Sequence, residues 1–249
     1  MIGVIARREL QSLFASPLAW AVLCVIQIIL AYIFLSRIEL FVQFQPRLLG
    51  LEGAPGLTDL VVAPLFGNTA ITLLLVAPLL TMRTFAEERR NGTLNLLLAA
   101  PLSMTEITLG KYLGLFGFFM LMLSLVGLMP LALLLGGQLD FGQLGAGFLG
   151  LGLLIAAFVA IGLFLSVLTD HPTVAGVSTF GALLLLWIVD WAGESGEASG
   201  VLHYLSLLGH YEPLLKGMFD SADLVYYVLL TALFLILTVW RLDAERLPR

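Results

Sequence analysis

The sequence predicts an all-α integral membrane protein with six transmembrane helices, an N-terminal interfacial helix and an outer re-entrant helical segment before the last span. Of the 249 residues, 60% are hydrophobic and 12% are charged, about half the charged share of an average soluble domain. These are too few polar side chains to cover a surface in water. Six segments also approach the roughly 20 apolar residues that a helix needs to cross a bilayer core, and Lys and Arg gather in alternate loops. We expect one transmembrane domain over residues 1–249.

The segment before the first span is predicted to be a separate helix lying flat at the cytoplasmic interface. Its apolar residues recur at helical spacing, with Arg7, Arg8 and Glu9 among them, a pattern typical of interfacial helices. Ser16 and Pro17 favour a break, because serine caps helix starts and proline is tolerated in the first turn. The alternative, an extension of the first span, stays open.

The predicted spans differ in how well they fit a bilayer. They cover residues 18–35, 60–82, 112–135, 144–168, 173–189 and 224–240. Pro130 is expected to kink the third span. The fifth span is short, and Asp190 follows it at once. Because an aspartate costs roughly 3 kcal/mol at mid-bilayer but far less at an interface, we place Asp190 and Trp191 at the membrane surface.

Two outer loops carry structural signals. The loop over residues 36–59 contains Pro46 and Pro55 and is predicted to be irregular. In the outer segment 192–223, apolar residues from 202 to 219 recur at three- and four-residue intervals. That spacing predicts a short amphipathic helix dipping into the outer leaflet, broken by Pro213.

His203 and His210 lie in the same outer segment. On one helix their spacing would place them roughly on one face, so a metal site is conceivable. Without further ligands in the pattern, we interpret both as interfacial polar side chains. We therefore expect no metal site and no catalytic residue in this chain, and the sequence assigns the two histidines no other role.

Lys and Arg are distributed unequally between the loops. With the N-terminus inside, nine lie on the cytoplasmic side and three outside. The inner set is Arg7, Arg8, Arg83, Arg89, Arg90, Lys111, Arg241, Arg246 and Arg249, and the outer set is Arg37, Arg47 and Lys216. Because positive residues collect on the cytoplasmic side of membrane proteins, both termini are predicted to be cytoplasmic.

Small and polar residues within the spans predict helix contacts. Two series with small residues four apart, Gly142, Ala146 and Gly150 and then Gly152, Ala156 and Ala160, would allow close helix approach. The alternative is that glycine is simply common in membrane helices. The main polar groups are expected to bond to backbone or to neighbouring helices; they are Gln27, Asn68, Thr69, Thr72, Ser124, Ser166, Ser178 and Thr179.

Several functional classes lack their motifs. No Gly-x-x-x-x-Gly-Lys-Ser/Thr loop occurs, so the chain is not expected to bind ATP itself. No basic stripe indicates nucleic-acid binding. The predicted spans also carry no Asp, Glu, Lys, Arg or His in their interiors, whereas ion-driven carriers usually keep such groups at mid-membrane. Energy for any transport is therefore expected to enter from outside the bilayer.

The loop between the second and third spans, residues 82–102, concentrates the chemistry. Charged residues come first, Gly92 is expected to end their helix, and Thr93 can cap a second short helix that presents leucines on one face and ends at Pro101. This predicts a rigid helical lever at the cytoplasmic surface whose polar end can insert into a partner.

The same loop carries a resemblance to a known family. The run from Phe85 to Leu94, followed by Leu97, Leu98, Pro101 and Gly110-Lys111, resembles the ABC-2 type permeases. Together with residues 209–217 and 226–241, it is most similar to the gliding-motility subgroup of bacterial ABC permeases. The resemblance covers essentially the whole chain.

The resemblance implies a half-transporter in the bacterial inner membrane. Two permease subunits, identical or homologous, would sit in membrane lipid on separate ATPase subunits that bind the ATP and magnesium. The residues implied to couple to the ATPase are Glu87, Glu88, Arg89, Arg90, Gly92, Thr93 and Leu94. The alternatives are a membrane scaffold that transmits ATPase-driven force to a periplasmic accessory protein, and an ion-driven carrier. The sequence does not identify the cargo.

Overall fold

The computed structural model describes residues 1–48, 56–94, 102–135, 139–193 and 204–246, and this part of the chain is helical with short connections. The elements are α1 (Ile2–Ala15), α2 (Pro17–Leu48), the π-helical turn η1 (Thr58–Val62), α3 (Ala63–Thr81), α4 (Ala86–Arg90), α6 (Met104–Leu131), the 3₁₀ turn η2 (Ala132–Leu135), α7 (Phe141–Val167), α8 (Pro172–Gly193), α10 (Leu207–Leu215) and α11 (Ser221–Arg246). Six helices of the described part are long and apolar enough to cross a membrane. The predicted all-α membrane fold is confirmed.

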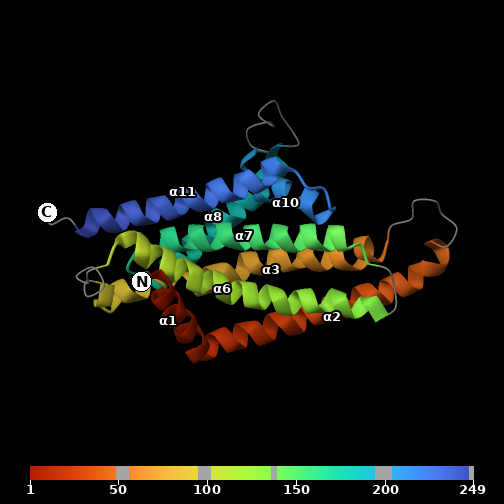
Figure 1. The fold of residues 1–249 in the computed structure, drawn as a ribbon, viewed down its shortest axis with the longest axis horizontal. Helices are drawn as coiled ribbons and strands as arrows, with labels where there is room; N and C mark the ends of the chain where they lie inside the picture. Colours follow the sequence, from red (N-terminus) through yellow and green to blue (C-terminus); the bar gives the residue numbers. More distant parts are fainter. Residues whose placement is uncertain (49–55, 95–101, 136–138, 194–203, 247–249) are drawn as a thin grey trace.

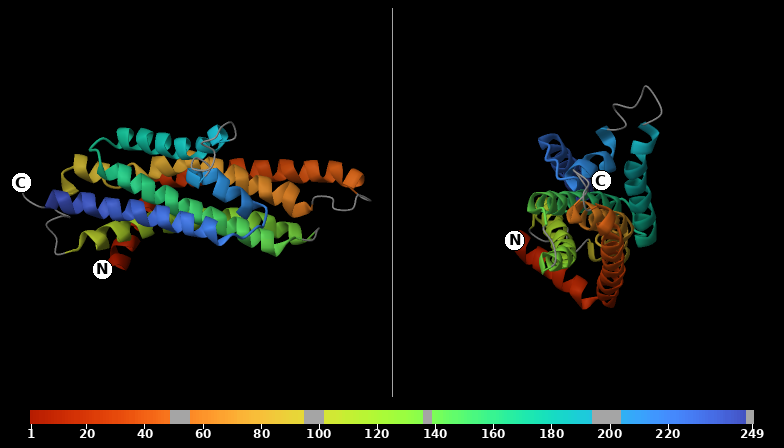
Figure 2. Two further views of the ribbon diagram at one scale, coloured as in Figure 1. Left: turned by 90° about the horizontal axis from the view of Figure 1, so that it is seen from above. Right: turned by 90° about the vertical axis from the view of Figure 1, so that its right-hand side faces the viewer.

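Helix α7 forms the centre of the bundle. It contacts α3, α6, α8, α10 and α11, and more of its span is buried than that of any other candidate span in the described part. Viewed down the bundle, α2 and α11 lie on opposite sides (Figure 2). Both leave large apolar side chains such as Ile28, Tyr32, Leu229 and Ile236 exposed, which lipid solvates without cost.

The two ends of the bundle carry different elements. The start of α1, the end of α11 and the turn after α3 lie near one end, whereas η1, η2 and α10 lie toward the other end (Figure 1). This arrangement agrees with termini that share one side of the membrane with the charged loop.

Helix α1 is separate from α2 and packs across α6. Ser16 has extended backbone angles (φ −84°, ψ 126°) that end α1, so the predicted break is confirmed. Two glycines of α6 allow the backbones to meet: a Cβ atom at Gly110 would lie 2.6 Å from the Ile5 side chain, and one at Gly114 would lie 3.0 Å from the Ala6 carbonyl oxygen. Small residues at such crossings are typical of membrane helix pairs.

We expect Gly114→Ala to loosen α1 from α6, because the added methyl would meet the Ala6 backbone, which cannot move without shifting the helix. Overpacking of this kind costs roughly 1–3 kcal/mol. Hydrogen exchange of α1 amides should accelerate and thermal stability should fall. The matched control is Gly3→Ala on α1, where a Cβ meets nothing within 4 Å; equal effects of the two changes would contradict the packing argument.

Several helices extend beyond the predicted membrane spans. Helix α2 continues to Leu48 with Pro46 inside it, so the first half of the loop predicted to be irregular is helical. Helix α6 begins at Met104 rather than Tyr112, because Ser103 and Glu106 form a capping box at its start. Pro130 lies in the last turn of α6, where the chain passes into η2.

Helices α8 and α11 are also longer than the predicted fifth and sixth spans. Asp190 and Trp191 lie near the end of α8.

Helix α10 confirms that a short helix precedes the last span, but not that Pro213 breaks it. Pro213 lies inside α10, three residues before the helix cap. The helix is ended by Gly217, which has φ +79°, with Met218 N donating to the Pro213 carbonyl at 2.9 Å and Gly217 N to Leu214 at 3.1 Å. This is a Schellman ending, which needs a residue that tolerates positive φ.

The polar side chains of the spans behave as predicted. All eight donate hydrogen bonds to backbone carbonyls: Gln27, Asn68, Thr69, Thr72, Ser124, Ser166, Ser178 and Thr179. The predicted small-residue series are only partly used. Gly150 packs against Leu214 and Tyr211 of α10, but Gly142 faces no other helix, and the tightest approach on α7 is that of Gly162 to Thr81.

Candidate functional site

The connection from α3 to α6 forms a short charged helix. After α3 ends at Thr81, a turn over residues 82–85 leads into α4. Asn91 N donates to Glu87 O at 2.9 Å and Gly92 N to Arg89 O at 3.1 Å. Gly92 has φ +71°, a region that residues with a Cβ adopt at a cost. The predicted helix break at Gly92 is therefore present.

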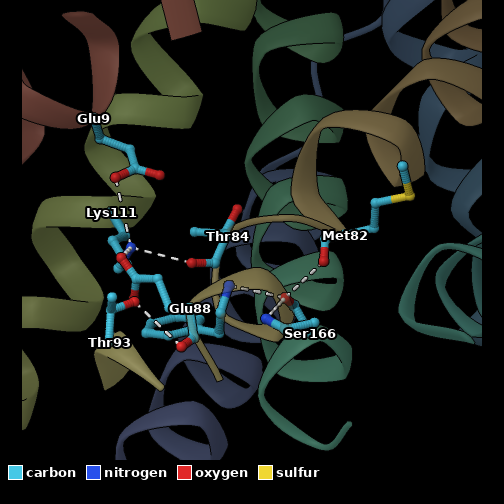
Figure 3. A network of polar contacts seen from close by, with 9 residues as sticks. Glu9, Met82, Thr84, Glu88, Thr93, Lys111 and Ser166 are labelled. Atoms are coloured by element: carbon cyan, nitrogen blue, oxygen red, sulfur yellow. Dashed lines mark hydrogen bonds and ion pairs between the residues drawn. The ribbon is translucent and has the colours of Figure 1, made fainter. Parts of the chain in front are cut away.

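Ser166 of α7 holds the turn before α4. Its hydroxyl accepts hydrogen bonds from the backbone N–H of Phe85 (3.0 Å) and Ala86 (3.1 Å) and donates to the Met82 carbonyl (3.2 Å) (Figure 3). The free N–H groups at the start of a helix need acceptors. Here a buried hydroxyl from a different span supplies one, so the start of α4 is attached to the centre of the bundle.

Lys111 of α6 holds α4 from the other side. Its side chain is 4% exposed, and its ammonium lies 2.7 Å from Glu88 Oε1 and 3.5 Å from Glu9 Oε2. It also donates to the Thr84 carbonyl at 3.1 Å and lies 5.1 Å from the centre of the Phe85 ring (Figure 3). A lysine this buried is stable as a cation only with such partners. One ammonium thus joins α1, α4 and α6.

Arg89 forms the third attachment. Its guanidinium donates to the Val167 carbonyl of α7 at 2.8 Å and to both carboxylate oxygens of Glu245 in α11, at 2.8 and 2.7 Å. Glu245 also pairs with Arg241 at 3.2 Å. Charge-assisted hydrogen bonds are roughly twice as strong as neutral ones. We call Lys111, Ser166, Arg89, Glu88 and Glu245 the clamp.

The clamp is not fully satisfied. Glu88 Oε2 and Arg89 Nε are buried without a hydrogen-bond partner among the described residues. A buried polar atom left unpaired costs about 1–3 kcal/mol. Glu88 Oε2 can therefore still accept a hydrogen bond, and Arg89 Nε can still donate one, beside the contacts that hold α4.

The seven predicted coupling residues separate into two groups. Glu88 and Arg89 face the bundle and hold α4 in place, and Leu94 is buried. The remaining four, Glu87, Arg90, Gly92 and Thr93, lie at or near the surface. Thr93 bonds back to the Glu88 carbonyl at 3.2 Å, and the second short helix expected after it falls on residues 95–101, outside the described residues.

The sequence did not predict which residues of the spans would bond to α4 and to the turn before it. Lys111 was assigned to a loop, yet it lies inside α6; the Ser103–Glu106 capping box, eight residues before it, is the signal that extends the helix. Ser166 was expected to bond to backbone groups, and it does. The backbone groups that it accepts from are those of the turn before α4, which the sequence did not indicate. No signal in the sequence pairs Arg89 with Glu245, because the two lie 156 residues apart.

The arrangement is suited to transmit movement. The turn before α4 and the inward-facing Glu88 and Arg89 are attached through polar contacts to α6, α7 and α11. Lys111 extends these contacts to Glu9 of α1. A five-residue helix held at several points cannot shift alone, so a force on its exposed side would move the ends of the spans that hold it.

The opposite end of the bundle contains a buried histidine. His210 Nδ1 lies 2.7 Å from Asp223 Oδ1, linking α10 to α11, and the imidazole stacks on Tyr226 with ring centres 4.1 Å apart. No group of three or more metal-ligating side chains is present among the described residues. The interpretation of His210 as a merely interfacial side chain is wrong in this respect, since it is a structural contact between helices. His203 lies outside the described residues.

Comparisons with known proteins agree with this architecture. The family model described as ABC-2 family transporter protein matches residues 52–190, which include α3, the clamp loop, α6, α7 and almost all of α8. No curated protein matches the chain. The match covers more than half of the sequence, and the chain belongs to the ABC-2 transporter family as a multi-pass transmembrane permease component.

Proposed function

We propose that the chain is the permease subunit of an ATP-driven exporter in the bacterial inner membrane, and that α4 is its coupling element. A separate ATPase binds ATP and magnesium, contacts the exposed side of α4, and moves the spans through the clamp. A second permease subunit completes the transport unit. The similarity of residues 85–94 and 209–217 to the gliding-motility permeases supports placing the chain in that subgroup of the ABC-2 permeases.

The observation that carries this proposal is the division of α4 into two faces. Arg90 and the backbone at Gly92 are exposed, whereas Glu88 and Arg89 on the same short helix are bonded to three other helices. A purely structural loop would need no exposed charged face. An element that receives force from a partner needs both a contact surface and a stiff connection to the spans.

We expect Gly92→Pro to abolish coupling without preventing membrane insertion. Proline fixes φ near −65°, whereas Gly92 has φ +71°, so the end of α4 must refold. ATPase stimulation by the permease should fall at least tenfold in proteoliposomes that contain the permease and its partner ATPase, because the contact surface is displaced.

Gly92→Asn is the matched control, because asparagine tolerates positive φ; it should retain most of the stimulation. Normal stimulation in Gly92→Pro would refute the coupling role. ATPase stimulation that persists with no solute moved would instead favour the scaffold that drives a periplasmic protein.

A further inference from the structure

A cavity of about 310 Å³ lies beside the clamp, between α1, the start of α2, the end of α3 and α4. Part of its lining is apolar and comes from the ends of the spans, including Leu18 of α2 and Leu79 of α3. The rest is polar and includes the charged side chains of Arg8, Arg83 and Glu87. A cavity with both linings at the end of the spans matches the boundary between acyl chains and headgroups.

Two arginines of the cavity have no partner among the residues that the structure describes. Neither Arg8 nor Arg83 forms an ion pair or hydrogen bond with another described residue, whereas Arg89 and Lys111 nearby are each bonded several times. Guanidinium groups bind phosphate through paired N–H donors. Two of them on one cavity, one from α1 and one from the turn after α3, favour a phosphate group as occupant.

The cavity also offers acceptors for a cation. Glu87 has no ion pair within the described part of the chain, and the Glu88 side chain, which is 27% exposed, also lines the cavity. A primary ammonium carries N–H donors for such carboxylates, whereas a quaternary ammonium carries none. Phosphate and primary ammonium occur together in one common lipid headgroup.

We propose that this cavity binds phosphatidylethanolamine from the leaflet at the α4 end of the bundle. Arg8 and Arg83 hold its phosphate, Glu87 and Glu88 receive its ammonium, and the apolar lining from α2 and α3 contacts the first part of the acyl chains. An acidic protein segment would use the arginines but leave the apolar lining without a partner. The site does not depend on the coupling function, although it shares Glu9 and Glu88 with the contacts of Lys111.

The test is native mass spectrometry of the purified full-length chain with phosphatidylethanolamine, phosphatidylcholine and phosphatidylglycerol of identical acyl chains. We expect phosphatidylethanolamine to bind about fivefold or more tightly than the other two, because only it supplies both groups. Arg8→Ala and Arg83→Ala should each weaken it about fivefold. Glu87→Gln should reduce the preference over phosphatidylcholine.

The matched control is Arg7→Ala, which removes the same charge from an exposed position on α1 that does not line the cavity; it should bind lipid normally. Arg8→Lys should give an intermediate loss and serves if Arg8→Ala does not fold. Equal binding of all three lipids, an equal effect of Arg7→Ala, or equally tight binding of soluble O-phosphoethanolamine would overturn the proposal. Unchanged lipid binding in Arg8→Ala and Arg83→Ala, with loss of ATPase retention, would overturn it in favour of a protein contact.

Discussion

Replacing Lys111 by methionine should destabilise the protein by about 3 kcal/mol, because it leaves Glu88 and Glu9 partly buried without their cation. In a chain of this size that corresponds to a fall of roughly 10 °C in the unfolding midpoint. Differential scanning fluorimetry in detergent would measure it. ATPase stimulation should be lost as well, since α4 would no longer be held to α6 and α1.

The double variant Lys111→Met/Glu88→Gln separates the ion pair from the loss of lysine packing. It removes both charges, so it should be more stable than Lys111→Met alone. Together with the single variant Glu88→Gln it completes a double-mutant cycle, which gives the coupling energy of the pair. Lys216→Met is the control, because that lysine is 65% exposed at the other end of the bundle; it should change the midpoint very little. Equal midpoints for Lys111→Met and Lys216→Met would show that the buried pair does not hold α4.

Replacing Gly162 by alanine should disrupt the contact between α7 and α3. A Cβ atom there would lie 2.6 Å from the Thr81 Cβ, far inside van der Waals contact. We expect a loss of about 3 kcal/mol, at the upper end of overpacking effects. Ser166 lies one helical turn later on the same face of α7, so its hydrogen bonds to the turn before α4 should weaken with it. Thermal unfolding and ATPase stimulation would measure the two consequences.

Gly145→Ala is the same substitution on the same helix, at a position where a Cβ meets nothing within 4 Å. It should be neutral. Thr81→Gly removes the side chain that clashes, so Gly162→Ala/Thr81→Gly should regain most of the stability. Failure of this rescue would mean that Gly162 matters for a reason other than its approach to Thr81.

The transmembrane spans were predictable because lipid requires long apolar helices, and hydropathy alone places their centres. Their ends were not. Residues 104–111 include polar and charged side chains and were therefore placed before the third span. The capping box at Ser103 starts the helix there, so Lys111 lies inside it. Likewise Pro213 suggested a break, whereas the positive φ of Gly217 decides where α10 ends.

The sequence predicted which loop forms the site, but not which residues of the other helices hold it. Composition and Gly92 indicate a short charged helix between two spans. Which charges face inward depends on Glu9, Ser166 and Glu245, and these reach the loop only through packing of α1, α7 and α11. Hydrophobic periodicity brings the helices together, but it does not say which polar residue will lie beside which.

Lys111 stands between two carboxylates at unequal distances, 2.7 Å from Glu88 and 3.5 Å from Glu9. If α4 is drawn away from the bundle, the ammonium can close on the second acid rather than stand alone in an apolar region. The energy barrier to the movement is lower than for an isolated pair, because a buried charge exchanges neighbours instead of losing one. In such a movement Glu9 would keep a carboxylate beside the ammonium, and the ion pair with α1 would replace the one with α4.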